Sequence, residues 1–232
     1  MACSRQRVYR KIAVSVPLNP KIYHIVHVDR LPSIISDNFI WCDAAMVAQQ
    51  KPGTAIGLNG IKRRRLYELT LESHPGLHVG ECTPFYLCPR SVMLFLIHCA
   101  NHEELTYRDG QGSIIHLEAD LRQTTAWASE QGLRWAFTLS NAGSTYFEDR
   151  CDLRQLSEIN WDAVRTNSWS GRGIAPFVKE GKQAEFLVEN RFPWHLVERV
   201  GVHSDRIQAF VNRAMQNSNH KPAVARLPEW YY

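Results

Sequence analysis

Short stretches of the chain alternate between apolar and polar residues, and segments with helical spacing lie between them. Residues 22–28 are rich in β-branched and aromatic side chains and predict an early strand, and a helix at Leu31–Asp37, with Pro32 in its first turn, is expected to follow. A second helix is expected from its cap Asp120 to about Gln131. Further elements are predicted as strands at 84–89, 113–117, 135–139 and 196–202 and as a buried helix at 92–98.

The last third of the chain has the clearest periodicity. Residues 183–189 alternate with period two, which places Ala184, Phe186 and Val188 on one face of a strand and Gln183, Glu185, Leu187 and Glu189 on the other. Ser204 and Asp205 begin an amphipathic helix with the apolar stripe Ile207, Phe210, Val211 and Met215. The elements have no regular βαβ rhythm, which favours the α+β class. Residues 43–65 are turn-rich and are expected to form a mobile loop over a site.

The length and composition predict one folded domain that covers residues 1–232. The chain is 44% hydrophobic and 22% charged, and it has no internal repeat or linker. No apolar run approaches the roughly 20 residues that span a bilayer. The basic residues from Arg5 to Lys11 are not followed by an apolar core, so we expect no secretory signal and a cytoplasmic protein.

Metal and disulfide chemistry find little support in the sequence. The six cysteines form no CxxC pair, and we expect them to be reduced: Cys3, Cys42, Cys82, Cys88, Cys99 and Cys151. His98 and His102 have the spacing of two helical metal ligands, but no carboxylate lies between them, so they are interpreted as ordinary histidines at a helix end. No metal is therefore expected.

The charge distribution indicates one basic segment. A formal charge of +4 and a pI near 8.8 permit an anionic partner without requiring one. The densest cluster is the run Lys62-Arg63-Arg64-Arg65, which follows the turn-like residues 57–60. A solvated helix start is the alternative interpretation of this cluster.

Glu185 is the strongest catalytic candidate. A carboxylate among apolar strand residues costs free energy unless it is paired, hydrogen-bonded or chemically active. Gln183 lies two residues earlier on the same face, whereas Glu189 lies about 13 Å further along the strand, too far for a two-carboxylate glycosidase pair. The alternative is a salt-bridged glutamate on a solvated face.

Three segments together resemble the DarT family of DNA ADP-ribosyltransferase toxins. The first is Tyr23–Ile34, the second is the Pro-Phe-Tyr-Leu-Cys-Pro-Arg-Ser-Val-Met-Leu run of 84–94, and the third is Gln183–Val188 followed by Phe192-Pro193-Trp194. They occur in the order found in the family, and the resemblance runs from about Ile22 to about Val211.

The resemblance implies a fold and a reaction. The fold would be an ADP-ribosyltransferase-like core of two small, mainly antiparallel sheets around an NAD cleft, with flanking helices. The reaction would be sequence-selective transfer of ADP-ribose from NAD⁺ to a thymine base in single-stranded DNA, with release of nicotinamide and without a metal. An antitoxin macrodomain protein that removes the adduct is the implied partner.

The resemblance also assigns catalytic roles. Glu185 would stabilise positive charge on the ribose as its bond to nicotinamide breaks. Arg64 or Arg65 would lie at the reaction centre and either stabilise the anion of a deprotonated thymine or bind a pyrophosphate or DNA phosphate, because an arginine is a poor general base. We therefore expect Arg64→Ala to abolish transfer to DNA while sparing most NAD⁺ binding.

Substrate-binding residues follow from the same match. His24 would hydrogen-bond a ribose, although a core histidine is the alternative, and Arg30 stands where the family commonly has asparagine. The residues expected to bind NAD⁺ are His24, Tyr23, Tyr86, Ser91, Met93 and Arg30. The residues expected to bind DNA are Gln183, Trp169, Arg172, Arg63 and Lys62, with Phe177 in the same acceptor loop as Trp169. A loop anchored by a buried Trp169 is the alternative for that position.

Two other functions stay open. The same fold could modify guanine, RNA or protein, because a Gln-x-Glu pair also occurs in transferases with other acceptors. A basic nucleic-acid-binding module without catalysis is the second alternative. Protection against thermal unfolding by NAD⁺ distinguishes the enzymes from the module.

Overall fold

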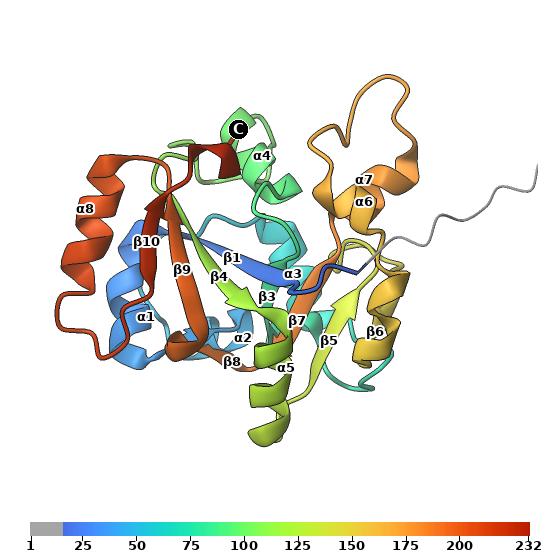
Figure 1. Ribbon diagram of the computed structural model, residues 1–232. Coiled ribbons are helices and arrows are strands. Elements are labelled where there is room, and N and C mark those ends of the chain that lie inside the picture. The colour runs from blue at the N-terminus through green and yellow to red at the C-terminus, as the bar shows by residue number, and fades with distance from the viewer. Residues whose placement is uncertain (1–15) are drawn as a thin grey trace, which may run out of the picture.

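Eight strands form the main sheet of the protein, in the order β10-β9-β4-β1-β3-β7-β5-β6 (Figure 1). The computed structural model describes residues 16–232. Neighbours in this sheet are antiparallel except β9 and β10, and a second sheet pairs β2 with β8. The strands are β1 (Lys21–His27), β2 (Phe39–Trp41), β3 (Cys82–Tyr86), β4 (Ile114–Asp120), β5 (Trp135–Thr138), β6 (Asp149–Arg150), β7 (Glu185–Glu189), β8 (Arg191–Pro193), β9 (Val197–Val202) and β10 (Ala223–Arg226).

Helices surround the sheet and fill the connections between strands. Helix α8 packs against β9, β10 and α1 at one end of the sheet, and α6 packs on α7 near the other end (Figure 1). The helices are α1 (Leu31–Asp37), α2 (Asp43–Ala48), α3 (Asn59–Tyr67), α4 (Val92–Cys99), α5 (Leu121–Glu130), α6 (Trp161–Arg165), α7 (Pro176–Lys182) and α8 (Asp205–Ala214). Short 3₁₀ helices occupy Val28–Arg30, Val79–Glu81, Leu153–Glu158, Trp194–Leu196 and Pro228–Trp230.

The α+β class is confirmed, but the expected pair of small sheets is wrong. One eight-stranded sheet and one two-stranded sheet are present instead. The physical reason is a single residue pair, Tyr23 with Tyr86, through which β1 joins β3. By contrast, β1 pairs with β4 along its whole length, and β3 pairs likewise with β7. Two four-stranded halves are therefore joined at one point, and they separate on either side of it.

The strongly periodic segments form the predicted elements. Helix α1 has the predicted bounds, and the carboxylate of Asp120 caps α5 by accepting hydrogen bonds from the backbone N–H groups of Arg122 and Gln123. On β7, Phe186 and its neighbours of the same face belong to the main core, whereas Leu187 packs into a second cluster with Leu71 and Leu77. The predicted alternation is confirmed, and both faces of β7 are buried.

Four local predictions are wrong. Residues 43–65 contain α2 and α3 rather than one loop. Neither helix has a buried residue. Phe177 lies on α7 rather than in a loop, and Gln183 is the residue that ends α7, so the strand begins only at Glu185. Phe210 is 40% exposed, since it lies at the edge of the buried stripe of α8.

The cysteines, and the two histidines with metal-like spacing, lie in ordinary structural positions. The five described cysteines are free, and Cys42, Cys82 and Cys88 among them are buried. Helix α4 ends at Cys99, so His98 and His102 do not share one helix face. Within residues 16–232, no helix is long and apolar enough to cross a membrane. Cys3 and the basic residues up to Lys11 lie outside the described residues.

Burial of His116 on β4 predicts a pH-dependent stability. Its Nε2 bonds the carbonyl of Pro89 at 3.0 Å, its Nδ1 has no partner, and burial lowers its pKa from 6.5 to about 4. The unfolded chain therefore binds a proton below about pH 6.5 that the folded chain refuses until about pH 4. As the pH falls from about 6.5 to about 4, the free energy of unfolding should therefore decrease by about 3 kcal/mol. Denaturant titrations of wild type and His116→Gln between pH 7 and 4 check this, and parallel pH profiles would contradict it.

Candidate active site

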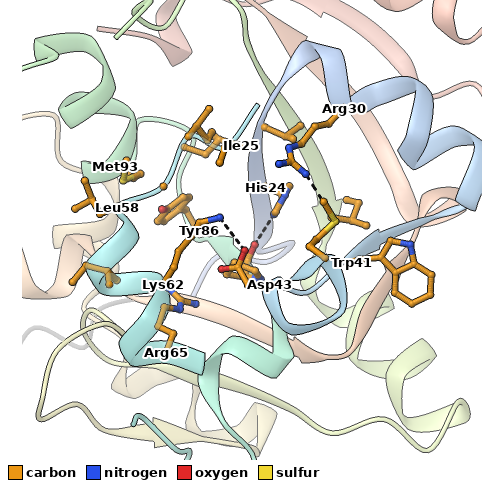
Figure 2. A pocket seen from close by; sticks show the side chains of 18 of the residues that line it. His24, Ile25, Arg30, Trp41, Asp43, Leu58, Lys62, Arg65, Tyr86 and Met93 are labelled. Atoms are coloured by element: carbon orange, nitrogen blue, oxygen red, sulfur yellow. Dashed lines mark hydrogen bonds and ion pairs between the residues drawn. The ribbon is translucent and has the colours of Figure 1, made fainter. Parts of the chain in front are cut away.

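A cleft opens where β1 and β3 separate. It has a volume of about 450 Å³, within the range of small-molecule sites. Its walls come from β1, α1, β2, α2, α3, β3, α4 and the start of β7, together with the connecting segment 54–58. Figure 2 shows the side chains of His24, Lys62, Arg65 and Tyr86 around this cleft.

Glu185 lines the cleft and is only 3% exposed. Its Oε2 accepts a hydrogen bond from Nη1 of Arg65 at 3.0 Å, and its Oε1 accepts one from the backbone N–H of Ala142 at 3.3 Å. The backbone N–H of Glu185 itself donates to Oγ1 of Thr138 at 3.0 Å. These contacts satisfy a buried carboxylate and fix its orientation, as a catalytic carboxylate requires.

Arg65 is the counter-ion of Glu185 and has spare donor capacity. Burial opposes its charge, but Glu185, Asp43 and Tyr86 together outweigh burial, and the pKa of Arg65 is raised. Its Nη2 is buried and has no hydrogen-bond partner. An unpaired donor of this kind is costly, so a ligand atom that accepts a hydrogen bond from it would be strongly favoured.

The other residues of the basic cluster lie elsewhere. Arg64 turns away from the cleft, where Nη2 donates to Oγ1 of Thr145 at 3.0 Å, and Arg63 is exposed. Lys62 lines the cleft and is paired with Asp43 at 3.0 Å. Of the two arginines expected at the reaction centre, the geometry brings only Arg65 to Glu185.

His24 connects the two halves of the sheet across the cleft. Its Nδ1 lies 2.8 Å from the carbonyl oxygen of Pro84, which can only accept, so Nδ1 carries the proton. Burial lowers the pKa of His24 and favours the neutral ring. In that form Nε2 is an acceptor, suited to a hydroxyl group such as one of a ribose.

The other expected NAD⁺ contacts divide between the cleft and its surroundings. Tyr86 and Met93 line the cleft. Ser91 does not, because its buried hydroxyl caps α4 by accepting from the N–H of Leu94. Tyr23 is also absent from the lining, and its hydroxyl donates to Glu118 at 3.2 Å.

Arg30 lines the cleft and holds the segment that covers part of it. Its guanidinium donates to the carbonyl of Thr54 at 2.9 Å and to that of Gly53 at 2.8 Å. A Cβ on Gly53, where φ is +121°, would lie 2.5 Å from Cγ of Arg30, so the close approach requires glycine here. Arg30 therefore shapes the cleft wall through residues 53–54.

The expected DNA-binding residues also divide. Gln183 lines the cleft, and its Oε1 accepts from Nδ2 of Asn141 at 3.2 Å. Trp169 is buried and donates its indole N–H to the hydroxyl of Tyr232 at 3.2 Å, as in the anchored-loop alternative. Arg172 and Phe177 are exposed.

The polar cleft residues that sequence reasoning missed include Asp43 and Asn141. Asp43 is the first residue of α2, in the segment interpreted as a loop. Asn141 follows β5 in the turn-like run Ser-Asn-Ala-Gly, which was a signal for a loop close to the site. Among residues 16–232, no group of three His, Cys, Asp or Glu side chains could hold a metal ion.

A cleft with a fixed, arginine-paired glutamate and an adjacent glutamine is the arrangement expected of an ADP-ribosyltransferase, and comparison with known proteins identifies the family. The model of the family described as "ssDNA thymidine ADP-ribosyltransferase, DarT" matches residues 23–232. The chain therefore belongs to the DarT family and is an NAD⁺-dependent DNA ADP-ribosyltransferase.

Similar proteins match along nearly the whole chain. A DNA ADP-ribosyl transferase of Thermus sp. (strain 2.9) is 30% identical and covers 91% of this chain and 95% of its own. One from Thermus aquaticus is 30% identical over 94% of this chain and 92% of its own. The solved structure of Thermus sp. 2.9 DarT in complex with ADP-ribosylated ssDNA has a TM-score of 0.83 at 29% identity, covering 94% of this chain and 99% of that one.

Proposed function

We propose that Glu185 carries the transfer of ADP-ribose from NAD⁺ to thymine in single-stranded DNA, with Arg65 as its partner at the reaction centre. The observation that supports this most is the largely buried Glu185–Arg65 pair, which lines the cleft together with Gln183. Removing two charges from water costs free energy even when they are paired. A cleft that contains such a pair is therefore a candidate for catalysis.

The reaction needs charge stabilisation on both substrates. The bond between the ribose C1 and nicotinamide breaks, nicotinamide leaves with the electron pair, and positive charge develops on the ribose. The fixed carboxylate of Glu185 stabilises that charge at low cost, because its hydrogen bonds already orient it. A ring nitrogen of thymine then bonds to C1, and its proton passes to water.

Arg65 and Gln183 suit the thymine side of this reaction. The unpaired Nη2 of Arg65 can donate to an oxygen of the base, where negative charge collects as the nitrogen loses its proton. Gln183 offers a donor and an acceptor in one group, and Asn141 holds it in place. An unpaired base is required, because the reacting nitrogen of thymine is covered in a duplex.

His24, Tyr86 and Met93 are the proposed NAD⁺ contacts within the cleft, with His24 accepting from a ribose hydroxyl through Nε2. Lys62 and the exposed Arg63 and Arg172 would contact DNA phosphates.

An antitoxin macrodomain protein is the proposed partner, and the cytoplasm is the proposed location. Support for the partner comes from the resemblance to toxins and from a fused relative. Thermosipho africanus DarTG in complex with ADP-ribose shares the fold, with a TM-score of 0.70 at 16% identity. The present chain covers 51% of that protein, so about half of it is an additional part.

The test weighs single-stranded oligonucleotides of varied sequence by mass spectrometry after incubation with the protein and NAD⁺. The expected result is a gain of one ADP-ribose unit on a subset of thymine-containing strands and none on strands without thymine. Modification of thymine-free strands would move the proposal to guanine. Unmodified DNA together with NAD⁺ protection against thermal unfolding would move it to RNA or protein acceptors.

A further inference from the structure

The side chain of Tyr232 connects two segments that are far apart in the sequence. Its hydroxyl donates to the carbonyl of Arg90 at 3.0 Å and accepts the indole N–H of Trp169 at 3.2 Å. Both hydrogen-bonding capacities of the hydroxyl are thus used, and burial raises the pKa of Tyr232, which keeps its proton available.

The ring of Tyr232 lies in a cluster that we call the Tyr232 cluster, formed by Arg90, Phe95, Trp169 and Tyr232. The Arg90 guanidinium lies 4.3 Å from the centroid of the Tyr232 ring. Phe95 contacts both Tyr232 and Trp169 edge-on, with centroids 5.1 Å apart in each pair. Such contacts add specific geometry to the burial of the rings.

One side of the cluster adjoins α4, which forms part of the cleft wall, and Phe95 of the cluster belongs to this helix. Arg90 precedes Ser91, the cap of α4, and α4 supplies Val92, Met93 and Leu96 to the cleft. The start of this helix is therefore fixed both by its own cap and by Tyr232. Figure 1 places the last residue of the chain beside α4.

The other side of the cluster is the segment 166–175, which precedes α7 and Gln183. It has no helix or strand, and Gly171 and Gly173 adopt positive φ values of 117° and 88°. Its tip is exposed at Arg172, whereas Trp169 is only 5% exposed. A segment without regular structure depends on such an anchor for its position.

We propose that Tyr232 is a positioning residue for DNA, because it joins segment 166–175 to the start of α4 and so holds the acceptor side of the site against the NAD⁺ cleft. This inference rests on the proposed function and goes beyond it. Tyr232 does not line the cleft, so it acts through Trp169 rather than on a substrate.

The test compares Tyr232→Phe with Tyr231→Phe. Tyr231 is the matched control, because its hydroxyl donates to the sheet carbonyls of Ile114 and Gly201 and not to segment 166–175. Tyr232→Phe should raise the KM for single-stranded DNA about fivefold, the size of one hydrogen bond, and leave the Kd of NAD⁺ unchanged. Hydrogen exchange in 166–175 should become faster in Tyr232→Phe and stay unchanged in Tyr231→Phe. Trp169→Phe, which removes the same bond from the other side, should reproduce both effects.

Each other result counts against the inference. An unchanged KM for DNA in Tyr232→Phe and Trp169→Phe would overturn it, as would equal effects in Tyr231→Phe. If Tyr232→Phe does not fold, Trp169→Phe decides on the same two measurements. Wild-type protein that modifies no DNA would contradict the proposed function instead, and slow exchange of 166–175 in Tyr232→Phe would still separately overturn the positioning role.

Discussion

Glu185→Gln is expected to lower the rate of ADP-ribose transfer by on the order of 10³-fold while NAD⁺ still binds. Glutamine has nearly the same shape and can still accept from the N–H of Ala142, but it carries no charge. The variant therefore removes the charge that would oppose the positive ribose, and it removes little else from the cleft. Single-turnover transfer to a thymine-containing oligonucleotide, measured beside NAD⁺ protection against thermal unfolding, checks the result.

The substitution also leaves Arg65 without its counter-ion, and breaking a buried pair commonly costs about 3–5 kcal/mol. Loss of activity must therefore be separated from loss of fold. Glu189→Gln is the matched control, because Glu189 lies on the same strand and is paired with Arg134 at 2.5 Å, but outside the cleft. Glu189→Gln should keep activity within about threefold, because this partly exposed ion pair does not reach the cleft. If folded Glu185→Gln kept activity within tenfold of wild type, the assigned role of Glu185 would be wrong.

Local sequence patterns predicted individual helices, helix caps and strand faces. Helix α1, the cap of α5 and the faces of β7 follow from proline placement, a capping carboxylate and period two, and the structure confirms each. Helices α2 and α3 were missed because neither sequence shows an apolar stripe: after Asp43 the residues of α2 are all Ala, Met or Val, and α3 contains the basic run 62–65. Tertiary contacts hold these helices in place, such as the ion pair between Asp43 of α2 and Lys62 of α3.

The pairings of the candidate site depend on contacts that no local pattern contains. Arg65 and Glu185 are 120 residues apart in the sequence, and Trp169 and Tyr232 are 63 apart. The resemblance to a family brought Glu185 and the basic cluster together, but it did not settle the register within the cluster. It also did not show that Trp169 is buried as an anchor, since an aromatic residue in a polar loop is equally suited to stacking on a base.

The second large effect concerns the choice between Arg64 and Arg65. Consecutive residues on a helix point about 100° apart, so only one of them can face Glu185. Arg65 does so from α3, whereas Arg64 bonds Thr145 outside the cleft. Arg65→Gln should lower the rate of transfer to DNA by about 10²-fold or more, because it removes both the counter-ion of Glu185 and the unpaired Nη2 donor.

Arg64→Gln is the matched control for this prediction and should keep the rate within about threefold, as expected for an exposed contact. Arg65→Lys separates charge from geometry, because lysine keeps the positive charge but cannot present two nitrogens in a fixed fork. An intermediate rate in Arg65→Lys would show that charge and the second donor both contribute. Rate measurements under saturating NAD⁺ and DNA compare the three variants. A larger loss in Arg64→Gln than in Arg65→Gln would exclude Arg65 from the reaction centre and restore Arg64 as the candidate.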